Sequence, residues 1–365
     1  MGQRTVTAIF LALSLVGSNV LHADEVPCLQ ASGGHGDARA IADAAAALQK
    51  LLTPAQRAAL ARPFDRESAI RWSNLPVGIV ARAGLRLGDL DATQSAAAHR
   101  VAEAALSACG LEMLDEIRLA DDVLKAVDTR KIGWSAGNYY LSLLGTPSAK
   151  SPWMLQIGGH HIAYNFTFNG KRDGATPLFF GTEPIHFAVN GVEHEPLKAQ
   201  STAMAQLAAA LATHPEAKLS GTFTDVVKGV VMIPVADGLP KGGTDTGFPQ
   251  TYPTGSVDRG ILYGELPLQT QALVRAALES FASLPGSAIT KTLVAAYEKP
   301  DSLAQTYAGY SGDPALSAKG SYVRIDGPRL WMELVVQPAV ANPAETHYHA
   351  LWRDKQSDYG GELTR

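Results

Sequence analysis

Four histidines occur in two short strings that could hold a metal ion. The first string is Gly158-Gly159-His160-His161, and the second is His347-Tyr348-His349. Both lie in segments rich in aromatic and β-branched residues, which predicts β-strands. Side chains alternate between the faces of a strand, so His347 and His349 share a face, whereas His160 and His161 point to opposite faces. The pair on one face predicts a two-point metal clamp, to which the other string adds a third imidazole.

His161 is the better candidate for that third ligand. It has the same parity as Ala163, Asn165 and Thr167, a small and polar set, whereas His160 has the parity of a core stripe. Gly158-Gly159 could bulge the strand and change this parity, so His160 stays a candidate. A metal-free site built from the same histidines and purely structural roles are the alternatives. His186 and His194 are reserve ligands.

Polar residues around the second string supply candidates for catalysis. Glu333 lies in the apolar strand predicted over 330–337, and a hairpin with 347–352 would bring it near His347 or His349. There it could act as a general base, a fourth ligand or a carboxylate that orients an imidazole. Arg353 has the parity of the histidines and could contact an anionic group beside the metal. The alternative is surface ion pairing with Asp354 or Asp358.

Two phenols and three further polar residues complete the candidate set. Tyr348 is a candidate catalytic residue, and both Tyr348 and Tyr164 offer redox-active phenols near a metal. We expect Asn165, Asp354 and Asp358 to contact the substrate or to support the residues that bind the metal. The sequence contains no G-x-S-x-G, H-E-x-x-H or P-loop motif, which excludes the chemistries that those motifs carry.

The elements that must position these residues predict an α+β fold. Helical spacing occurs over 37–52, 53–60, 91–109, 111–127, 197–213 and 266–283, with Gly110 expected to end the third helix. Strands are expected over 153–157, 162–168, 185–189, 321–325, 330–337 and 347–352. N-terminal helices therefore precede a largely antiparallel sheet region with interspersed helices. We expect one domain over 24–365, with a flexible Gly/Pro/Thr-rich loop at 238–256.

The beginning of the chain resembles an export signal. Arg4 precedes an apolar run over 6–16, and a small residue, Ala23, precedes Asp24-Glu25. This pattern predicts a signal peptide over 1–23. We therefore expect the protein outside the cytoplasm, either periplasmic or secreted. The apolar run is too short to span a bilayer, so we expect no stable membrane insertion. In that compartment Cys28 and Cys109 could form a structural disulfide, or remain two unrelated thiols.

Composition is ordinary for a globular protein. The 365 residues are 46% hydrophobic and 18% charged, with a net charge of -4. This excludes a collagen-like or wholly disordered chain, and the lack of a basic field argues against nucleic acid as a partner. We expect a small-molecule substrate; protein partners are not indicated.

Several longer strings resemble one family. They are Trp153 to Asn165, Thr176 to Gly181 with Pro184, Tyr307 to Gly312, Ser321 to Pro328, and His347 to Asp354 with Asp358-Tyr359-Gly360. Together they resemble the domain-of-unknown-function family numbered 3500, from about residue 40 to 363. One departure is the strand that carries Glu333. In the family it usually continues to an Asn-Gln pair, whereas here it continues as Val335-Val336-Gln337. The resemblance implies that both histidine strings belong to one site, but it implies no reaction.

Three imidazoles suit copper, zinc, iron or nickel. We favour a copper-dependent oxidoreductase that acts on a small molecule, because the expected ligands are all histidines and the protein is expected to be exported. The alternatives are a zinc-dependent hydrolase, with a metal-bound hydroxide as nucleophile, and a non-catalytic metal or ligand carrier.

Overall fold

The computed structural model describes residues 36–130, 132–170, 173–229, 231–233, 241–245, 247–361 and 363. The predicted signal peptide and Cys28 lie outside the described residues. Cys109 forms a disulfide. Among the described residues no helix is both long and apolar enough to cross a membrane.

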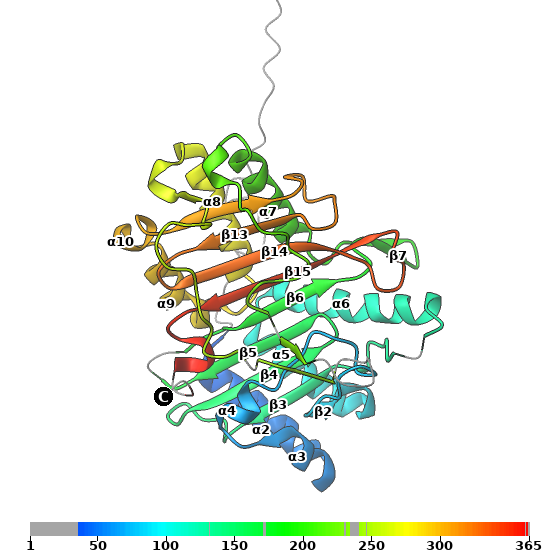
Figure 1. Cartoon of the computed structure of the whole chain (residues 1–365). Helices are drawn as coiled ribbons and strands as arrows, with labels where there is room; N and C mark the ends of the chain where they lie inside the picture. Colours follow the sequence, from blue (N-terminus) through cyan, green and yellow to red (C-terminus); the bar gives the residue numbers. More distant parts are fainter. Residues whose placement is uncertain are drawn as a thin grey trace, which may run out of the picture.

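A large, mostly antiparallel sheet forms the centre of the described molecule, as the α+β prediction requires. Its 11 strands run in the order β1-β3-β4-β5-β6-β15-β14-β13-β12-β11, with β2 paired to β3. The only parallel pair in this described sheet joins β1 to β3. The C-terminal strands, red and orange in Figure 1, thus lie beside the green strand β6 from the middle of the chain. This arrangement brings the two histidine strings together.

The six predicted strand segments correspond to β4, β5, β7, β13, β14 and β15, and the other strands were not predicted. The strands are β1 (Ala61–Arg62), β2 (Leu85–Arg86), β3 (Tyr140–Leu144), β4 (Trp153–Gly159), β5 (Ile162–Phe168), β6 (Leu178–Thr182), β11 (Ile261–Leu262), β12 (Tyr307–Ser311), β13 (Tyr322–Asp326), β14 (Leu330–Pro338) and β15 (Thr346–Asp354). Two small hairpins, β7 (Phe187–Val189) with β8 (Val192–His194) and β9 (Val231–Ile233) with β10 (Lys241–Thr244), lie outside this sheet.

Helices pack on one face of the sheet. They are α2 (Ala38–Leu51), α5 (Ala92–Ala105), α6 (Ala108–Val127), α7 (Lys198–Leu211), α8 (Leu268–Ala282) and α9 (Ser287–Tyr297). The shorter α3 (Pro54–Leu60), α4 (Arg66–Ala69) and α10 (Pro300–Leu303) connect longer elements. The main hydrophobic core lies between these helices and side chains such as Tyr164, Met332 and Trp352. Burial of this apolar surface is the largest favourable contribution to folding.

One predicted helix boundary is wrong, for a packing reason. Gly110 does not end a helix but lies in the first turn of α6, whose N-cap is Ser107. A Cβ at Gly110 would lie 2.0 Å from the carbonyl oxygen of Leu284. The glycine therefore permits a close approach between α6 and the chain after α8, and tertiary packing determines its position.

Irregular segments cover the opposite face of the sheet, and this face is more polar. A second apolar cluster there includes Trp72, Phe179, Phe223, Leu351 and Tyr359. The odd-numbered residues of β14 and β15 point to this side, so Glu333, His347, His349 and Arg353 share it. We call it the loop-covered face.

Part of the loop expected over 238–256 packs onto this face. Asp245 and Phe248 are buried, and the amide of Asp245 donates to the carbonyl of Ile70 at 2.8 Å. Residues 238–240 and 246 lie outside the described residues. The described residues near Asp245 therefore cover part of this face of the sheet.

Candidate metal centre

A two-residue turn positions His161. Gly159 of β4 pairs with Ile162 of β5, so His160 and His161 form the connection between the strands. His161 has a φ of 61°, a left-handed conformation uncommon outside glycine. Its amide donates to the Asn74 carbonyl at 3.0 Å, and its carbonyl accepts from the Gly181 amide at 2.8 Å. These two contacts hold the turn in place.

The expectation that His160 and His161 point to opposite faces is wrong. Their ring centroids lie only 3.6 Å apart. Strand alternation does not apply, because both residues belong to a turn. The preference for His161 as the third imidazole nevertheless selects the residue that lies beside His347 and His349.

Three imidazoles converge on the loop-covered face. His161, His347 and His349 each offer one ring nitrogen, and the three nitrogens lie within 4.8 Å of one another. The Nε2 atoms of His347 and His349 are 3.1 Å apart. Two tetrahedral ligands with metal–nitrogen bonds of about 2.0–2.1 Å would be roughly 3.3 Å apart. The spacing of the three nitrogen atoms therefore suits ligands of a single metal ion. We call His161, His347 and His349 the histidine triad.

Burial keeps His161 and His347 uncharged. The side chains of the histidine triad are 1–5% exposed. Desolvation lowers the pKa of His161 and His347 well below the usual 6.5, and the neighbouring histidines lower both further. Neutral imidazoles have the free lone pair that a metal requires, so the site is ready to bind a metal at neutral pH.

Two carboxylates hold histidines in this cluster, and neither was expected from the sequence. The Asp225 carboxylate accepts from His349 Nδ1 at 2.9 Å, which leaves Nε2 of His349 for the metal. The Asp121 carboxylate lies 2.6 Å from His160 Nδ1. Each aspartate lies far along the chain from its histidine, and no motif marks it. His160 is thus a buried partner of Asp121. The His160 ring also lies against the ring of His161.

Glu333 lies on the expected face but has a different role from those we predicted. It pairs with Leu351 in the sheet register, two pairs away from Val335–His349. Its carboxylate accepts from the amides of Val227 and Lys228, both at 2.8 Å, and from the Tyr322 hydroxyl at 2.6 Å. Burial raises its pKa. Asp225, not Glu333, orients the imidazole, and Glu333 anchors the loop that carries Asp225.

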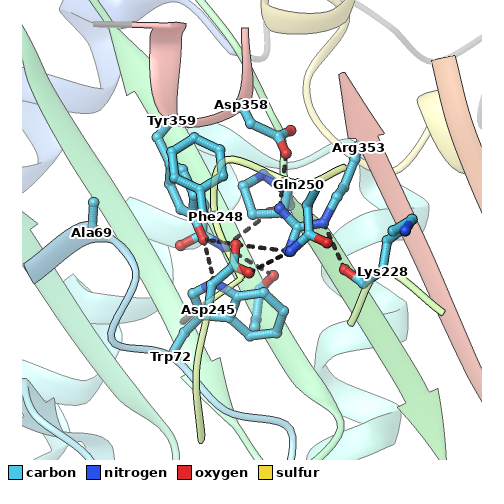
Figure 2. Close-up of polar contacts among 12 residues, drawn as sticks. Ala69, Trp72, Lys228, Asp245, Phe248, Gln250, Arg353, Asp358 and Tyr359 are labelled. Atoms are coloured by element: carbon cyan, nitrogen blue, oxygen red, sulfur yellow. Dashed lines mark hydrogen bonds and ion pairs between the residues drawn. The ribbon is translucent and has the colours of Figure 1, made fainter. Parts of the chain in front are cut away.

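Arg353 is buried in an ion-pair network (Figure 2). Its guanidinium contacts the carboxylates of Asp245 at 2.7 Å and Asp358 at 2.9 Å, and its Nε donates to the Lys228 carbonyl at 2.7 Å. The Tyr359 hydroxyl also donates to Asp245, and Trp72 Nε1 donates to Tyr359. Arg353 does form an ion pair with Asp358, but the pair is buried and not at the surface, and the second partner is Asp245 instead of Asp354.

Both phenols and Asp354 lie on the helix-covered face, away from the histidine triad. The Tyr348 ring packs against the main core, and the Tyr164 hydroxyl donates to Met113 Sδ. Asp354 accepts from the Tyr297 hydroxyl and pairs with Arg329, both at 2.9 Å. The expectation that these phenols flank the metal is wrong, because even-numbered residues of β15 and β5 point to the opposite face.

The remaining candidates have other partners. Asn165 is buried on the loop-covered face, where its amide donates to the Pro177 carbonyl at 2.8 Å and accepts from Gln156 at 2.8 Å. The reserve ligands are not part of the triad: His186 pairs with Glu193, and His194 with Glu116.

Gly181 of β6 lies directly beside the triad. A Cβ there would be 2.9 Å from His161 Cδ2, 3.0 Å from His349 Cδ2 and 2.6 Å from the Tyr348 carbonyl oxygen. Only glycine leaves room for both rings at this point of the sheet. The resemblance motif over 176–181 thus contains a residue that the site requires.

The chain belongs to the family described as "Protein of unknown function (DUF3500)", whose sequence model matches residues 35–361. This confirms the resemblance drawn from the strings. Neither a curated protein nor a solved structure matches the chain.

Proposed function

We propose that this protein is an exported metal-dependent enzyme whose metal is held by the histidine triad. The observation that carries the proposal is the convergence of three buried imidazole nitrogens within 4.8 Å. Burying three imidazoles against one another is costly by itself, and it becomes favourable when a metal binds a nitrogen of each. The Asp225–His349 contact supports the same conclusion, since carboxylates commonly orient metal-binding histidines.

We propose copper as the metal and oxidation of a small molecule as the reaction. The group of ligands contains three imidazoles and no carboxylate among the described residues. Imidazoles suit copper, and copper would supply one-electron redox chemistry when bound. The chain itself fixes the His349 ring through Asp225 and the His161 backbone through Asn74, and burial limits the access of water. The periplasm or the extracellular medium is the proposed location.

A zinc-dependent hydrolase is the second candidate. Three histidine ligands leave a coordination position for water in catalytic zinc sites. The contacts of Glu333 weaken this alternative, because its carboxylate already accepts three hydrogen bonds and does not contact a triad histidine. A hydrolase would need a base from elsewhere or rely on the metal-bound hydroxide alone.

Reconstitution distinguishes the candidates. The chain from residue 24, stripped of metal, is loaded with copper or zinc and assayed for oxygen consumption and for ester and amide hydrolysis over a panel of small molecules. The proposal predicts turnover only with copper, and none for the His347→Ala/His349→Ala variant. Hydrolysis with zinc would reverse the assignment. Tight metal binding without turnover on either panel would favour a carrier.

A further inference from the structure

A pocket of about 340 Å³ opens on the helix-covered face of the sheet. It lies between α6, the β7–β8 hairpin, the start of α7 and the chain after α8. Met113, which lines it, accepts a hydrogen bond from Tyr164, whose side chain points away from the histidine triad. Ligand pockets have volumes of about 300–1,000 Å³, so this one has room for a small organic molecule. It is separate from the proposed metal centre.

Carboxylates dominate the charged lining of this pocket. Glu112 and Glu116 lie one turn apart on α6, and Glu193 and Glu195 lie at the end of the hairpin. Among the described lining residues the only lysine or arginine is Lys198, which pairs with Glu195 at 3.4 Å. Like charges four residues apart on a helix repel each other. Carboxylates on two walls of a cleft also focus a negative potential that attracts a cation.

The charge is only partly met by neighbouring side chains. Glu116 contacts His194 at 2.9 Å, and Glu193 contacts His186 at 3.0 Å. Glu112 is exposed, and its carboxylate makes no hydrogen bond or ion pair with a described residue. Within the described ranges only the histidine triad brings three metal-binding atoms close together. A metal ion therefore does not account for this pocket, whereas an organic cation can contact carboxylates on separate walls.

A buried amide oxygen in the lining has no partner. Gln200 is 3% exposed and lines the pocket, and its Nε2 donates to the Ser280 carbonyl at 2.7 Å. This bond fixes the orientation of the amide, because the reversed amide would place an oxygen against another acceptor. Its Oε1 is buried without a hydrogen-bond partner among the described residues. An unpaired buried acceptor is costly, so Gln200 points to a ligand that donates an N–H or O–H.

We propose that this pocket binds a small organic cation with primary ammonium groups. An ammonium group has the positive charge that the glutamates attract and the N–H donors that Gln200 Oε1 lacks. Hydrogen bonds from a charged donor to a carboxylate are stronger than those between neutral groups. Met113, Pro196 and Leu284 supply apolar surface for the carbon chain of the ligand. Binding requires no metal and does not rest on the proposed function.

Isothermal titration calorimetry of 1,4-diaminobutane into the metal-free chain from residue 24, at low ionic strength, tests the proposal. We expect Glu112→Gln to weaken binding about threefold and Glu112→Gln/Glu116→Gln about tenfold, because ionic contacts near solvent are individually modest. The matched control is Glu67→Gln/Glu216→Gln, which removes the same charge from exposed glutamates outside the pocket. It should leave the affinity unchanged. Glu112 is exposed, so its replacement leaves the fold intact.

Two related compounds separate charge from hydrogen bonding. The uncharged 1,4-butanediol should not bind detectably. The quaternary analogue of the diamine, in which methyl groups replace every N–H hydrogen, should bind about tenfold more weakly, because it cannot donate to Gln200 Oε1. Undetectable binding of the diamine, equal weakening in the pocket and control double variants, or equal binding of the diol or the quaternary analogue would overturn the proposal.

Discussion

At the scale of single residues, the histidine triad depends on groups that fix protonation and orientation. His349 has a carboxylate partner on Nδ1, and His161 has both backbone groups held by neighbouring segments. The role of Asp225 differs from that of a solvated surface acid, although its side chain is 49% exposed. Its exposure marks the side of the triad nearest to solvent.

Asp225→Asn should weaken metal affinity by about 10- to 100-fold, because the imidazole of His349 loses its charged partner. Competition with a chelator of known affinity measures the change. Asp115→Asn is the matched control, since it breaks a surface pair with His99 at 3.1 Å outside the site. Equal affinity in Asp225→Asn and wild type would contradict an orienting role for Asp225.

The metal-free protein should lose stability as the pH falls below 6.5. The pKa of His161 and His347 is lowered in the folded state, so the unfolded chain binds more protons in that range. Each histidine should reduce the free energy of unfolding by up to about 1.4 kcal/mol per pH unit below 6.5, until the folded-state pKa is reached. Urea unfolding at several pH values measures this slope. His161→Gln/His347→Gln should flatten it and the exposed His99→Gln should not; an unchanged slope in the double variant would refute the lowered pKa values.

At the scale of elements, three strands and one turn assemble the site. β15 supplies two imidazoles on one face, the turn between β4 and β5 supplies the third, and β6 lies between these strands. A loop over 225–228 then links the triad to the rest of the face: Asp225 contacts His349, the amides of Val227 and Lys228 contact Glu333, and the Lys228 carbonyl contacts Arg353. Glu333 therefore acts on the histidine triad only through this loop.

Gly181→Ala should displace both neighbouring imidazoles. The added Cβ would lie within 3.0 Å of a ring carbon of His161 and of His349. Overpacking of this kind costs about 1–3 kcal/mol, and the metal affinity should fall as the ring nitrogens separate. Chelator competition and urea unfolding measure the two effects. Gly264→Ala, with open space around its Cβ, should change neither; wild-type affinity in Gly181→Ala would show that the site tolerates a methyl group there.

At the scale of the whole molecule, a buried ionic network joins the covering segments to the sheet. Asp245 belongs to the segment over 238–256, Trp72 to the segment after α4, and Arg353, Asp358 and Tyr359 to the C-terminal part of the chain (Figure 2). All five side chains are buried. The network therefore stabilises the cover of the loop-covered face as one unit.

Asp245→Asn should destabilise the protein by about 3–5 kcal/mol, because it leaves the buried charge of Arg353 partly uncompensated. Asp89→Asn, which breaks the exposed pair with Arg86, should cost less than about 1 kcal/mol. Urea unfolding of both variants provides the comparison. Similar free energies of unfolding for the two variants would contradict a stabilising role for the network.

The sequence was sufficient for the elements because their hydrophobic periods are local. The segments over 162–168, 330–337 and 347–352 match β5, β14 and β15 within two residues at each end, and the parity of His347 and His349 is confirmed. The helix α9 and the strands β3, β6 and β12 do not correspond to any segment predicted from the sequence.

The partners of the site residues could not be predicted in the same way. Asp225–His349, Asp121–His160 and Asp245–Arg353 each join residues 39 or more positions apart, and no local pattern encodes such pairs. Strand parity predicts opposite faces for His160 and His161, but these two residues form a turn, to which that parity does not apply. The strand parity of Tyr348 directs its side chain to the face opposite the histidine triad, and the structure confirms this direction. The expectation of a phenol beside the metal conflicts with that parity.

The metal content of the chain from residue 24, purified without a histidine tag, tests the central claim most directly. Elemental analysis compares the wild type with His347→Ala/His349→Ala and with His186→Ala/His194→Ala, which removes two histidines outside the triad. The account predicts about one equivalent of transition metal, copper by our proposal, in the wild type and the control, and none in the triad variant. No metal in the wild type even after reconstitution with copper or zinc, or equal metal in all three proteins, would contradict it.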